Sequence, residues 1–253
     1  MKTHSVRYLL CVLLMGLAQA GAAQEPLTIK IAFEDWPPWM IATPEGGLPG
    51  GAAVDLLNEA MQQMGIQGHY INLPFVRALK ELDKGSIDLL MLVARSPDRD
   101  SYMVFSDAVL NQRTLFCYSN QRNAGFSWSR LEDLARYKVG ITRGYTYSGR
   151  RAAIVRHAKN VEDSVSDEQS LIRLMAGRVD VAVFFESTLP AFLTKYPQAK
   201  QELRCHAKAL METQLHFGIS KKSALLAKLP RFNRVIGQIN VSHSLLERIS
   251  PKP

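Results

Sequence analysis

The sequence predicts an α/β protein whose mainly parallel β-sheets are flanked by helices. Short strand-like runs alternate with amphipathic, helix-like stretches along almost the whole chain. Two of these runs, residues 87–93 and 179–185, are almost continuously apolar, which is typical of strands buried on both faces of a parallel sheet. Strands that alternate with helices in this way form parallel sheets with helical crossovers.

The first half of the chain carries two clear helix signals. Residues 53–64 keep their apolar side chains on one helical face, and Gly65 follows as a stop signal. Gly85 ends a second helical stretch in the same way. The expected elements of this half are a strand at 27–33, a loop rich in Pro and Gly at 35–51, a helix at 53–64, a strand at 69–73, a helix at 75–84 and a strand at 87–93.

The second half repeats the alternation. Ser129, with Glu132 three residues later, forms a capping box that opens a short helix. Residues 167–176 place Leu171 and Leu174 on one inward face. The expected strands are 114–119, 138–142, 179–185, 203–209 and 214–220, and the further helices are 149–158, 167–176, 189–196, 225–239 and 244–249.

Ligands in open α/β sheets bind at the carboxyl ends of the strands. The loops after Phe33, Val93, Thr142 and Phe185 are therefore the first places to look for a site. The chain has no Gly-rich phosphate loop, no Gly-x-Ser-x-Gly elbow and no His-Glu-x-x-His zinc helix. Its six histidines are scattered without ligand spacing, so we expect neither a metal nor a cofactor.

The N-terminus predicts a cleaved signal peptide over residues 1–23. Lys2 and Arg7 precede an apolar run at 8–17, which small residues such as Ala20 and Ala22 follow. The run is too short to anchor the chain in a bilayer. We therefore expect an exported protein of the periplasm.

The formal net charge is +8, and removal of Lys2 and Arg7 leaves +6. Export argues against nucleic acid as a partner, and the chain has no Lys/Arg run or basic stripe with interleaved aromatic residues. Two interpretations of the basic balance stay open. One is a solvated basic surface, and the other is a cleft that attracts anions.

Two cysteines, Cys117 and Cys205, lie beyond the signal peptide. An even count in an exported protein favours a disulfide, with two buried free thiols as the alternative. Such a bond closes a long loop and contributes about 4 kcal/mol in the chain-entropy model.

A series of motifs then gives the chain a family resemblance. They are Trp36-Pro37-Pro38-Trp39, PFVRALKELDKGSID, Arg99 six residues before Phe105-Ser106, KVGITRGYT with Gly144 and Thr146, GRVDVAVFFES, and HFGIS at 216–220. In this order and spacing the chain resembles the bacterial extracellular solute-binding proteins of family 3, which are the polar amino-acid binding proteins of ABC importers. The resemblance runs from about Leu27 to Ile249.

The resemblance implies a two-lobed type II periplasmic binding protein fold, with two mainly parallel sheets joined by two crossing hinge strands. Lobe one would comprise residues 24–112 and 215–253, and lobe two residues 113–214. The solute would bind between the lobes, which hinge shut around it. Such proteins are monomers as a rule, and the partner would be an ABC-type membrane permease or a membrane sensor.

Arg99 is the first site residue that the resemblance implies. A planar guanidinium offers two parallel donors to a carboxylate, and charge-assisted pairs of this kind are strong. Gly144, Tyr145 and Thr146 lie between a strand and a helix, where backbone N–H groups bind anions. The alternative for Arg99 is a surface position in a charged loop, and for Thr146 it is helix capping.

Aromatic residues would form the walls of the same site. Phe75 occupies the family position where an aromatic ring packs on the ligand, and Trp36 follows the first strand. Core packing is the alternative for both residues, and it is our expectation for Trp39.

The ammonium half of the amino-acid site departs from the family pattern. The loop before Arg99 ends at Ser96 and is one residue short. The aspartate that normally pairs with the ligand amine is replaced by Phe185, with Glu186 directly after it, and Glu34 is the nearest acid after the first strand. Three arginines, Arg77, Arg95 and Arg143, would also face the cleft. We therefore hypothesise an anionic or unusual amino-acid-like solute.

Three functions remain in competition. The first is capture of a small polar solute, an amino acid or a related carboxylate, for an ABC importer. The second is presentation of that solute to a membrane sensor. The third is a dehydratase-like enzyme on the same fold, with Glu186 shielded beside Phe184 and Phe185 as its general acid. Because no second catalytic partner is apparent, we expect a binding protein without enzymatic activity.

Overall fold

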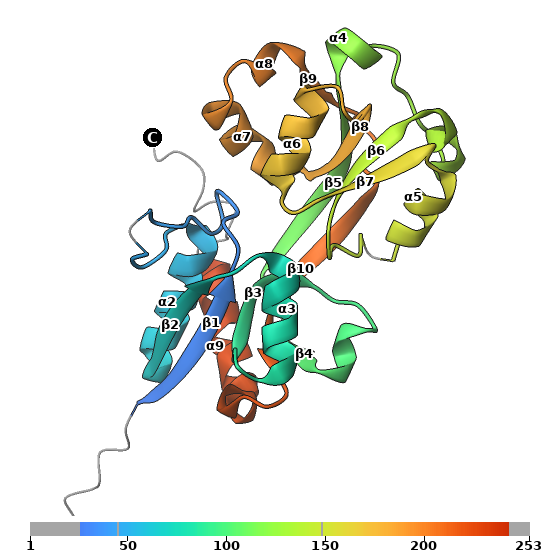
Figure 1. Ribbon diagram of the computed structural model, residues 1–253. Coiled ribbons are helices and arrows are strands. Elements are labelled where there is room, and N and C mark those ends of the chain that lie inside the picture. Colours follow the sequence, from blue (N-terminus) through green and yellow to red (C-terminus); the bar gives the residue numbers. More distant parts are fainter. Residues whose placement is uncertain (1–25, 45, 148, 243–253) are drawn as a thin grey trace, which may run out of the picture.

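The computed structural model describes residues 26–44, 46–147 and 149–242. The expected signal peptide, 1–23, and the expected helix at 244–249 lie outside the described residues. Figure 1 shows two bodies, one above the other, that two long strands connect. The fold is α/β, as the alternation of sequence patterns predicts.

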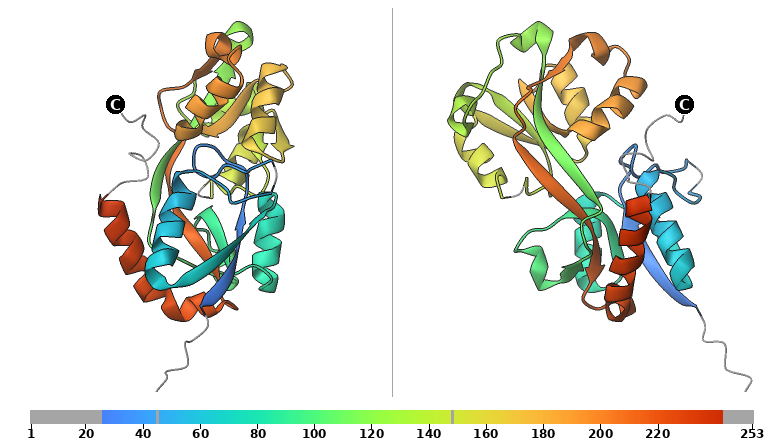
Figure 2. Two further views of the ribbon diagram at one scale, coloured as in Figure 1. Left: turned by 90° about the vertical axis from the view of Figure 1, so that its left-hand side faces the viewer. Right: turned by 180° about the vertical axis from the view of Figure 1, so that it is seen from behind.

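The lower body, which we call lobe one, is built on parallel strands in the order β2-β1-β3. Helix α2 and the C-terminal helix α9 pack together on one side of this sheet, and α3 covers the other side (Figures 1 and 2). The elements are β1 (Leu27–Phe33), α2 (Ala52–Met64), β2 (Ile66–Asn72), α3 (Phe75–Lys84), β3 (Leu89–Ala94), β4 (Met103–Phe105) and α9 (Leu229–Ser242).

The upper body, lobe two, repeats this arrangement with the parallel order β8-β6-β7. Its elements are α4 (Asn120–Asn123), β6 (Lys138–Thr142), α5 (Arg151–His157), β7 (Asn160–Ser164), α6 (Asp167–Met175), β8 (Val181–Phe185), α7 (Leu189–Lys195), α8 (Ala199–Glu202) and β9 (Leu203–Cys205). Each lobe buries a separate apolar cluster on each face of its sheet, so each lobe has its own two-sided core.

Strands β5 (Leu110–Ser119) and β10 (Met211–Ser220) run through both lobes. They pair with each other in antiparallel register from Leu110 opposite Leu215 to Thr114 opposite Met211. The sequence predicts two sheets, whereas the strands form one continuous sheet in the order β2-β1-β3-β10-β5-β8-β6-β7. The difference arises because the two crossing strands lie side by side and hydrogen-bond to each other.

Most expected elements are present, and the differences are local. Helices α2 and α3 end at Gly65 and Gly85, both in the left-handed conformation that glycine adopts without strain. The turn that Ser129 opens is a 3₁₀ helix (Leu131–Arg136), and Asp133, not Glu132, accepts the capping hydrogen bonds. Strand β7 was not expected from the sequence, because its residues alternate without a sustained apolar run.

Two expected elements are shorter or divided. The strand expected at 203–209 ends at Cys205. The helix expected at 225–239 begins as a 3₁₀ turn (Ala224–Lys228) and restarts at Leu229. Pro230 explains the restart, because a residue without an N–H group fits only the first turn of an α-helix.

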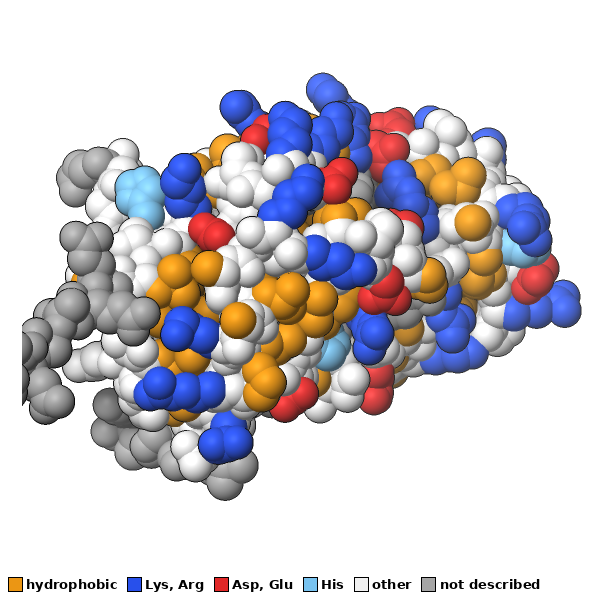
Figure 3. All heavy atoms as spheres, turned by 90° about the horizontal axis from the view of Figure 1, so that it is seen from below, with side chains coloured by type: hydrophobic (Ala, Val, Ile, Leu, Met, Phe, Trp, Pro, Cys, Tyr) orange, Lys and Arg blue, Asp and Glu red, His pale blue; other side chains and the backbone are white. Residues whose placement is uncertain are grey.

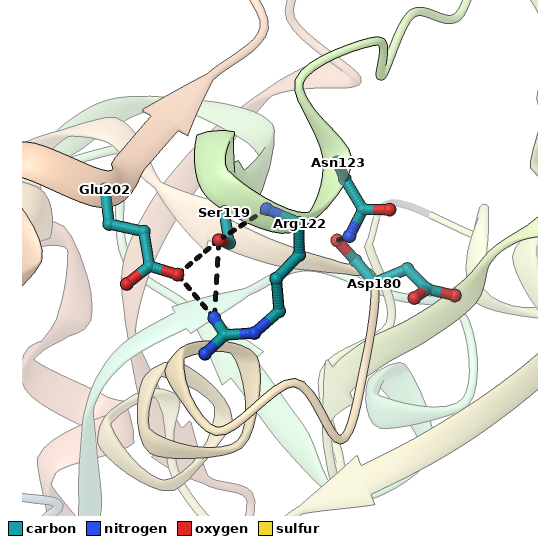
Figure 4. A network of polar contacts seen from close by, with 5 residues as sticks. All are labelled: Ser119, Arg122, Asn123, Asp180 and Glu202. Atoms are coloured by element: carbon teal, nitrogen blue, oxygen red, sulfur yellow. Dashed lines mark hydrogen bonds and ion pairs between the residues drawn. The ribbon is translucent and has the colours of Figure 1, made fainter.

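The predicted disulfide between Cys117 and Cys205 is formed. The two residues lie directly opposite each other on β5 and β9. A polar network at the same end of β5 also reaches α8, since Ser119 and Arg122 both donate hydrogen bonds to Glu202 (Figure 4). Asn123 extends this network to the backbone carbonyl of Asp180, 3.1 Å away.

Reduction of the disulfide should destabilise lobe two, because the bond closes a chain segment with a sequence separation of 88 residues. We expect a loss of about 4 kcal/mol, or on the order of 10 °C in melting temperature, when thermal unfolding is measured with a reductant. The C117A/C205A double variant is the control and should melt at the same temperature with and without reductant. An unchanged melting temperature of the reduced wild-type protein would contradict the expectation.

Candidate functional site

A pocket lies between the lobes at the carboxyl ends of the central strands, where the sequence places the site. Three of the four expected loops contribute to it, those after Phe33, Val93 and Thr142, whereas at the fourth place only Phe185 itself lines it; the crossing strand β10 closes one side. The lining residues are Glu34, Trp36 and Met40 after β1, Phe75 of α3, Leu90–Leu92, Ala94 and Arg99 at and after β3, Tyr145–Tyr147 after β6, Phe185 of β8, and Met211, Thr213 and Leu215 of β10.

Arg99 is a buried cation at the boundary of the two lobes. Its side chain is 2% exposed, follows β3 and donates to the carbonyl oxygens of Ala94 (2.7 Å) and Gly144 (2.8 Å). The second of these bonds links lobe one to lobe two. Burial lowers the pKa of Arg99 from its ordinary value, and its Nε has no hydrogen-bond partner among the described residues. Besides the two carbonyls, the guanidinium interacts with the side chain of Tyr102 and lies near Asp98. A buried guanidinium whose hydrogen bonds go to neutral groups is a strong site for an anion.

The turn after β6 forms the opposite wall. Gly144 has a φ of +83°, and a Cβ atom there would lie 2.9 Å from Val76 and 3.1 Å from Phe75, so this glycine allows close contact between the lobes. The hydroxyl of Thr146 is buried and lacks a partner in the described part of the chain. The turn does not sit at a helix N-terminus as expected, because α5 begins only at Arg151.

Aromatic rings from both lobes meet around the pocket. Phe75 contacts Tyr145 edge-on with ring centroids 5.4 Å apart, and Trp36 contacts Phe185 at 5.1 Å. Tyr145 also lies 5.8 Å from Phe185. Trp39 is fully buried in the core of lobe one, as expected, and its indole N–H donates to Ser187.

Two carboxyl groups flank the outer end of the pocket, one from each lobe. Glu34 follows β1 and accepts a hydrogen bond from the backbone of Phe75, and Asp167 is the first residue of α6. Burial first, and then repulsion from Asp167 and Asp35, raises the pKa of Glu34 to about 8. Burial raises the pKa of Asp167 to about 7, against a hydrogen bond from Thr142 that lowers it. Sequence analysis missed Asp167.

A second opening, which we call the outer groove, adjoins the pocket at this end. Glu34, Trp36 and Tyr145 line both spaces, whereas Asp167 lines only the outer groove. Asp167 could have been predicted if strand β7 had been recognised in the sequence. Residues that follow adjacent parallel strands meet at one edge of the sheet, and Asp167 follows β7 as Arg143 follows β6.

The other expected site residues lie outside the pocket. Arg77 and Arg143 are exposed, and Arg95 is exposed beside Asp100, with 3.5 Å between their nearest charged atoms. Ser96 is buried and lines a separate groove between the lobes. These three arginines therefore do not line the pocket, although Arg95 and Ser96 line the neighbouring groove, and Glu34 lies at the outer end of the pocket. The pocket itself thus takes its positive charge from Arg99 and not from a cluster of arginines.

Glu186 is not the shielded acid that the sequence suggested. It is exposed after β8 and forms an ion pair with Arg113 at 2.8 Å. Figure 3 shows Lys and Arg side chains scattered over the face seen from below, with Asp and Glu between them. On this face the charges therefore have the distribution of a solvated surface.

The acids of the pocket should make the stability of the free protein depend on pH. Their ordinary pKa values are 4.5 for Glu34 and 3.8 for Asp167, and both values are raised in the folded state. The folded protein therefore binds more protons than the unfolded chain between those values and about pH 8, so the free energy of unfolding falls as the pH rises through this window.

The E34Q/D167N double variant should remove this dependence. We expect it to melt above the wild type at about pH 8 and to lose that advantage near pH 4, with about 2–4 °C for each kcal/mol of repulsion relieved. Thermal unfolding across the pH range measures the effect. E186Q, which alters an exposed carboxyl group outside the pocket, is the matched control. A pH profile of the double variant parallel to that of the wild type would refute the assignment.

Within the described residues, we find no helix with the length and apolar character needed to cross a membrane. No curated protein sequence matches the chain.

The fold is shared with several solved binding proteins. The P235GK mutant of ArgBP from T. maritima superposes with a TM-score of 0.72 at 21% identity, covering 87% of this chain and 94% of that one. A substrate binding protein of an amino acid ABC transporter gives 0.70 at 18%, covering 87% and 96%. A histidine kinase sensor domain with similarity to periplasmic binding proteins gives 0.75 at 18%, covering 88% and 94%.

The family assignment rests on the sequence itself. Residues 29–245 match the pattern of the bacterial extracellular solute-binding proteins, family 3. This match covers both lobes and both crossing strands. The chain therefore belongs to the bacterial extracellular solute-binding proteins of family 3.

Proposed function

We propose that this protein captures an amino acid in the periplasm, by its carboxylate, and delivers it to an ABC-type permease. The observation that carries the proposal is Arg99, a buried cation at the junction of the lobes that lines the pocket and has an unpaired Nε among the described residues. Its hydrogen bonds go to neutral groups, namely the carbonyls of Ala94 and Gly144 and the side chain of Tyr102. Asp98 attracts it electrostatically, but the two side chains form no salt bridge in the described part of the chain.

A carboxylate would satisfy this charge with hydrogen bonds from both lobes. Arg99 offers the guanidinium from lobe one, and the hydroxyl of Thr146 stands ready as a donor in lobe two. A solute that bridges these groups would favour the closed arrangement, because each lobe alone supplies only part of the partners. Phe75 and Trp36 would pack on its apolar part.

Two further observations fit an exported binding protein. The Cys117–Cys205 disulfide suits an oxidising compartment such as the periplasm, and the N-terminal sequence has the pattern of a signal peptide. Among the solved relatives in fold is a substrate binding protein of an amino acid ABC transporter.

Presentation of the solute to a membrane sensor is the second candidate, because the same fold occurs in a histidine kinase sensor domain. Both roles use the same pocket and the same closure. The enzyme hypothesis loses its acid, since Glu186 is exposed and paired with Arg113.

Replacement of Arg99 should abolish solute binding. After removal of any bound solute by unfolding and refolding, calorimetric titration with L-amino acids should identify ligands of the wild type. R99A should weaken the best of them by about a hundredfold or more, because loss of a buried charge partner costs several kcal/mol. R95A changes an exposed arginine four positions earlier and should bind like the wild type. Equal affinity of R99A and R95A would exclude the carboxylate role of Arg99.

Closure of the lobes should depend on Gly144. In G144A the new methyl group would press on Val76 and Phe75 across the lobe boundary, and we expect about a tenfold loss of affinity. G149A is the matched control, since Gly149 has a similar φ of +80° but open space around its Cβ position in the described part of the chain. Both variants should lose about 1–2 kcal/mol of stability from the left-handed backbone. If both also bind alike, Gly144 has no special part in closure.

A further inference from the structure

We propose that Glu34 and Asp167 together bind a cationic group at the far end of the solute, which is therefore an amino acid whose side chain ends in an ammonium or guanidinium group. This inference rests on the proposed function, in which the carboxylate of the same solute binds Arg99.

The lining residues show that the two ends of the site carry opposite charges. We call the pocket around Arg99 the inner chamber, which the outer groove adjoins. Arg99 lines only the inner chamber, and Asp167 lines only the outer groove. Glu34, Trp36 and Tyr145 line both and so lie between the two ends. A solute that reaches from Arg99 to Asp167 would carry its negative group inside and its positive group outside, with an apolar chain along the aromatic rings.

The inner chamber is small. Its free volume is about 40 Å³, which is room for about three water molecules. In this structure the chamber accommodates a carboxylate but not a whole amino acid with a long side chain. The rest of the solute would extend past Trp36 and Tyr145 into the groove, toward the two acids.

Asp167 lines the groove and has one carboxylate oxygen without a partner among the described residues. Its side chain is only 5% exposed, and Thr142 donates a hydrogen bond of 2.5 Å to Oδ1. Its Oδ2 has no partner within the described residues. A buried carboxylate oxygen without a donor costs free energy that a cationic ligand would recover.

Helix capping does not account for Asp167. The cap of α6 is Ser166, whose hydroxyl accepts a hydrogen bond from the backbone of Gln169. The side chain of Asp167 is instead turned to Thr142 at the end of β6. Its position at the start of α6 therefore orients the carboxyl group toward the lobe boundary, where Glu34 approaches from lobe one.

The nearby basic side chains are engaged by other acids. Lys195 lines the groove but pairs with Glu168 at 2.7 Å, and Arg151 of α5 pairs with Asp163 at 2.5 Å. Two further acids line the groove: Glu168, which pairs with Lys195, and Asp35, which accepts a hydrogen bond from the backbone of Ala42. Glu34 and Asp167 thus repel each other across the boundary, and a cation between them would convert that repulsion into two attractions.

A pair of isosteric solutes tests this inference. L-Arginine and L-citrulline have nearly the same shape, but only arginine carries a charge at the end of its side chain. Titration calorimetry of the refolded full-length mature protein should show arginine or L-lysine binding about ten- to a hundredfold more tightly than citrulline or L-glutamate. E34Q and D167N should each reduce the preference for arginine over citrulline by about tenfold or more. E186Q is the matched control and should preserve it.

The preference ratio separates contact with the cation from loss of folding, because a misfolded variant loses both solutes together. If citrulline or glutamate binds as tightly as arginine and still requires Arg99, the inference is wrong and the proposed function stands. If arginine is preferred but both acid variants keep the wild-type preference, the inference is also wrong. If no carboxylate-bearing solute binds the wild type, the proposed function fails and this inference fails with it.

Discussion

The antiparallel pairing of β5 with β10 is the constraint on which the rest of this structure depends. Residues Leu110–Thr114 and Met211–Leu215 hydrogen-bond where the chain passes between the lobes. This short ladder joins the two halves of the continuous sheet, which otherwise have separate cores. It also directs the carboxyl ends of β1 and β3 toward those of β6 and β8, so that loops distant in the sequence form one pocket.

A pocket made in this way must bury charges that neither lobe neutralises alone. Arg99 of lobe one uses a carbonyl of lobe two, and Glu34 of lobe one lies near Asp167 of lobe two. The cationic and acidic ends are separated by the rings of Trp36, Tyr145 and their neighbours, and Arg99 binds backbone carbonyls instead of these acids. Unpaired buried charges of opposite sign are unfavourable for the free protein and favourable for a solute that carries the complementary pair.

The sequence predicts the part of this arrangement that rests on local patterns. Buried strands, glycine stops and the Arg99 motif can each be recognised from a few consecutive residues, and the corresponding elements are present. Asp167 cannot be recognised from such a local pattern. The strand before it has no apolar run, and an acid at the start of a helix is common on protein surfaces. Only the pairing of β7 with β6 brings it to the pocket.

The prediction that Arg77 and Arg95 face the cleft relies too much on a local pattern, namely their closeness in sequence to pocket residues. In the structure, α3 and the loop after β3 turn these side chains to solvent. Proximity along the chain does not specify which way a side chain points, since neighbouring helix positions are about 100° apart. The orientation follows from the packing of Ala78 and Leu82 against the sheet, which leaves Arg77 on the outer face.

Under the proposed function, closure and recognition would depend on the same groups. Arg99 lines the pocket and bonds to Gly144 across the lobe boundary through a terminal nitrogen, so a carboxylate that took this N–H group would displace a bond between the lobes. A solute stabilises the closed arrangement only if its own contacts to both lobes exceed the contact it displaces. A single anion satisfies one end and leaves the acids of Glu34 and Asp167 in mutual repulsion. Under the proposal, a solute with both charges would relieve both ends at once, so the two charges together would favour closure.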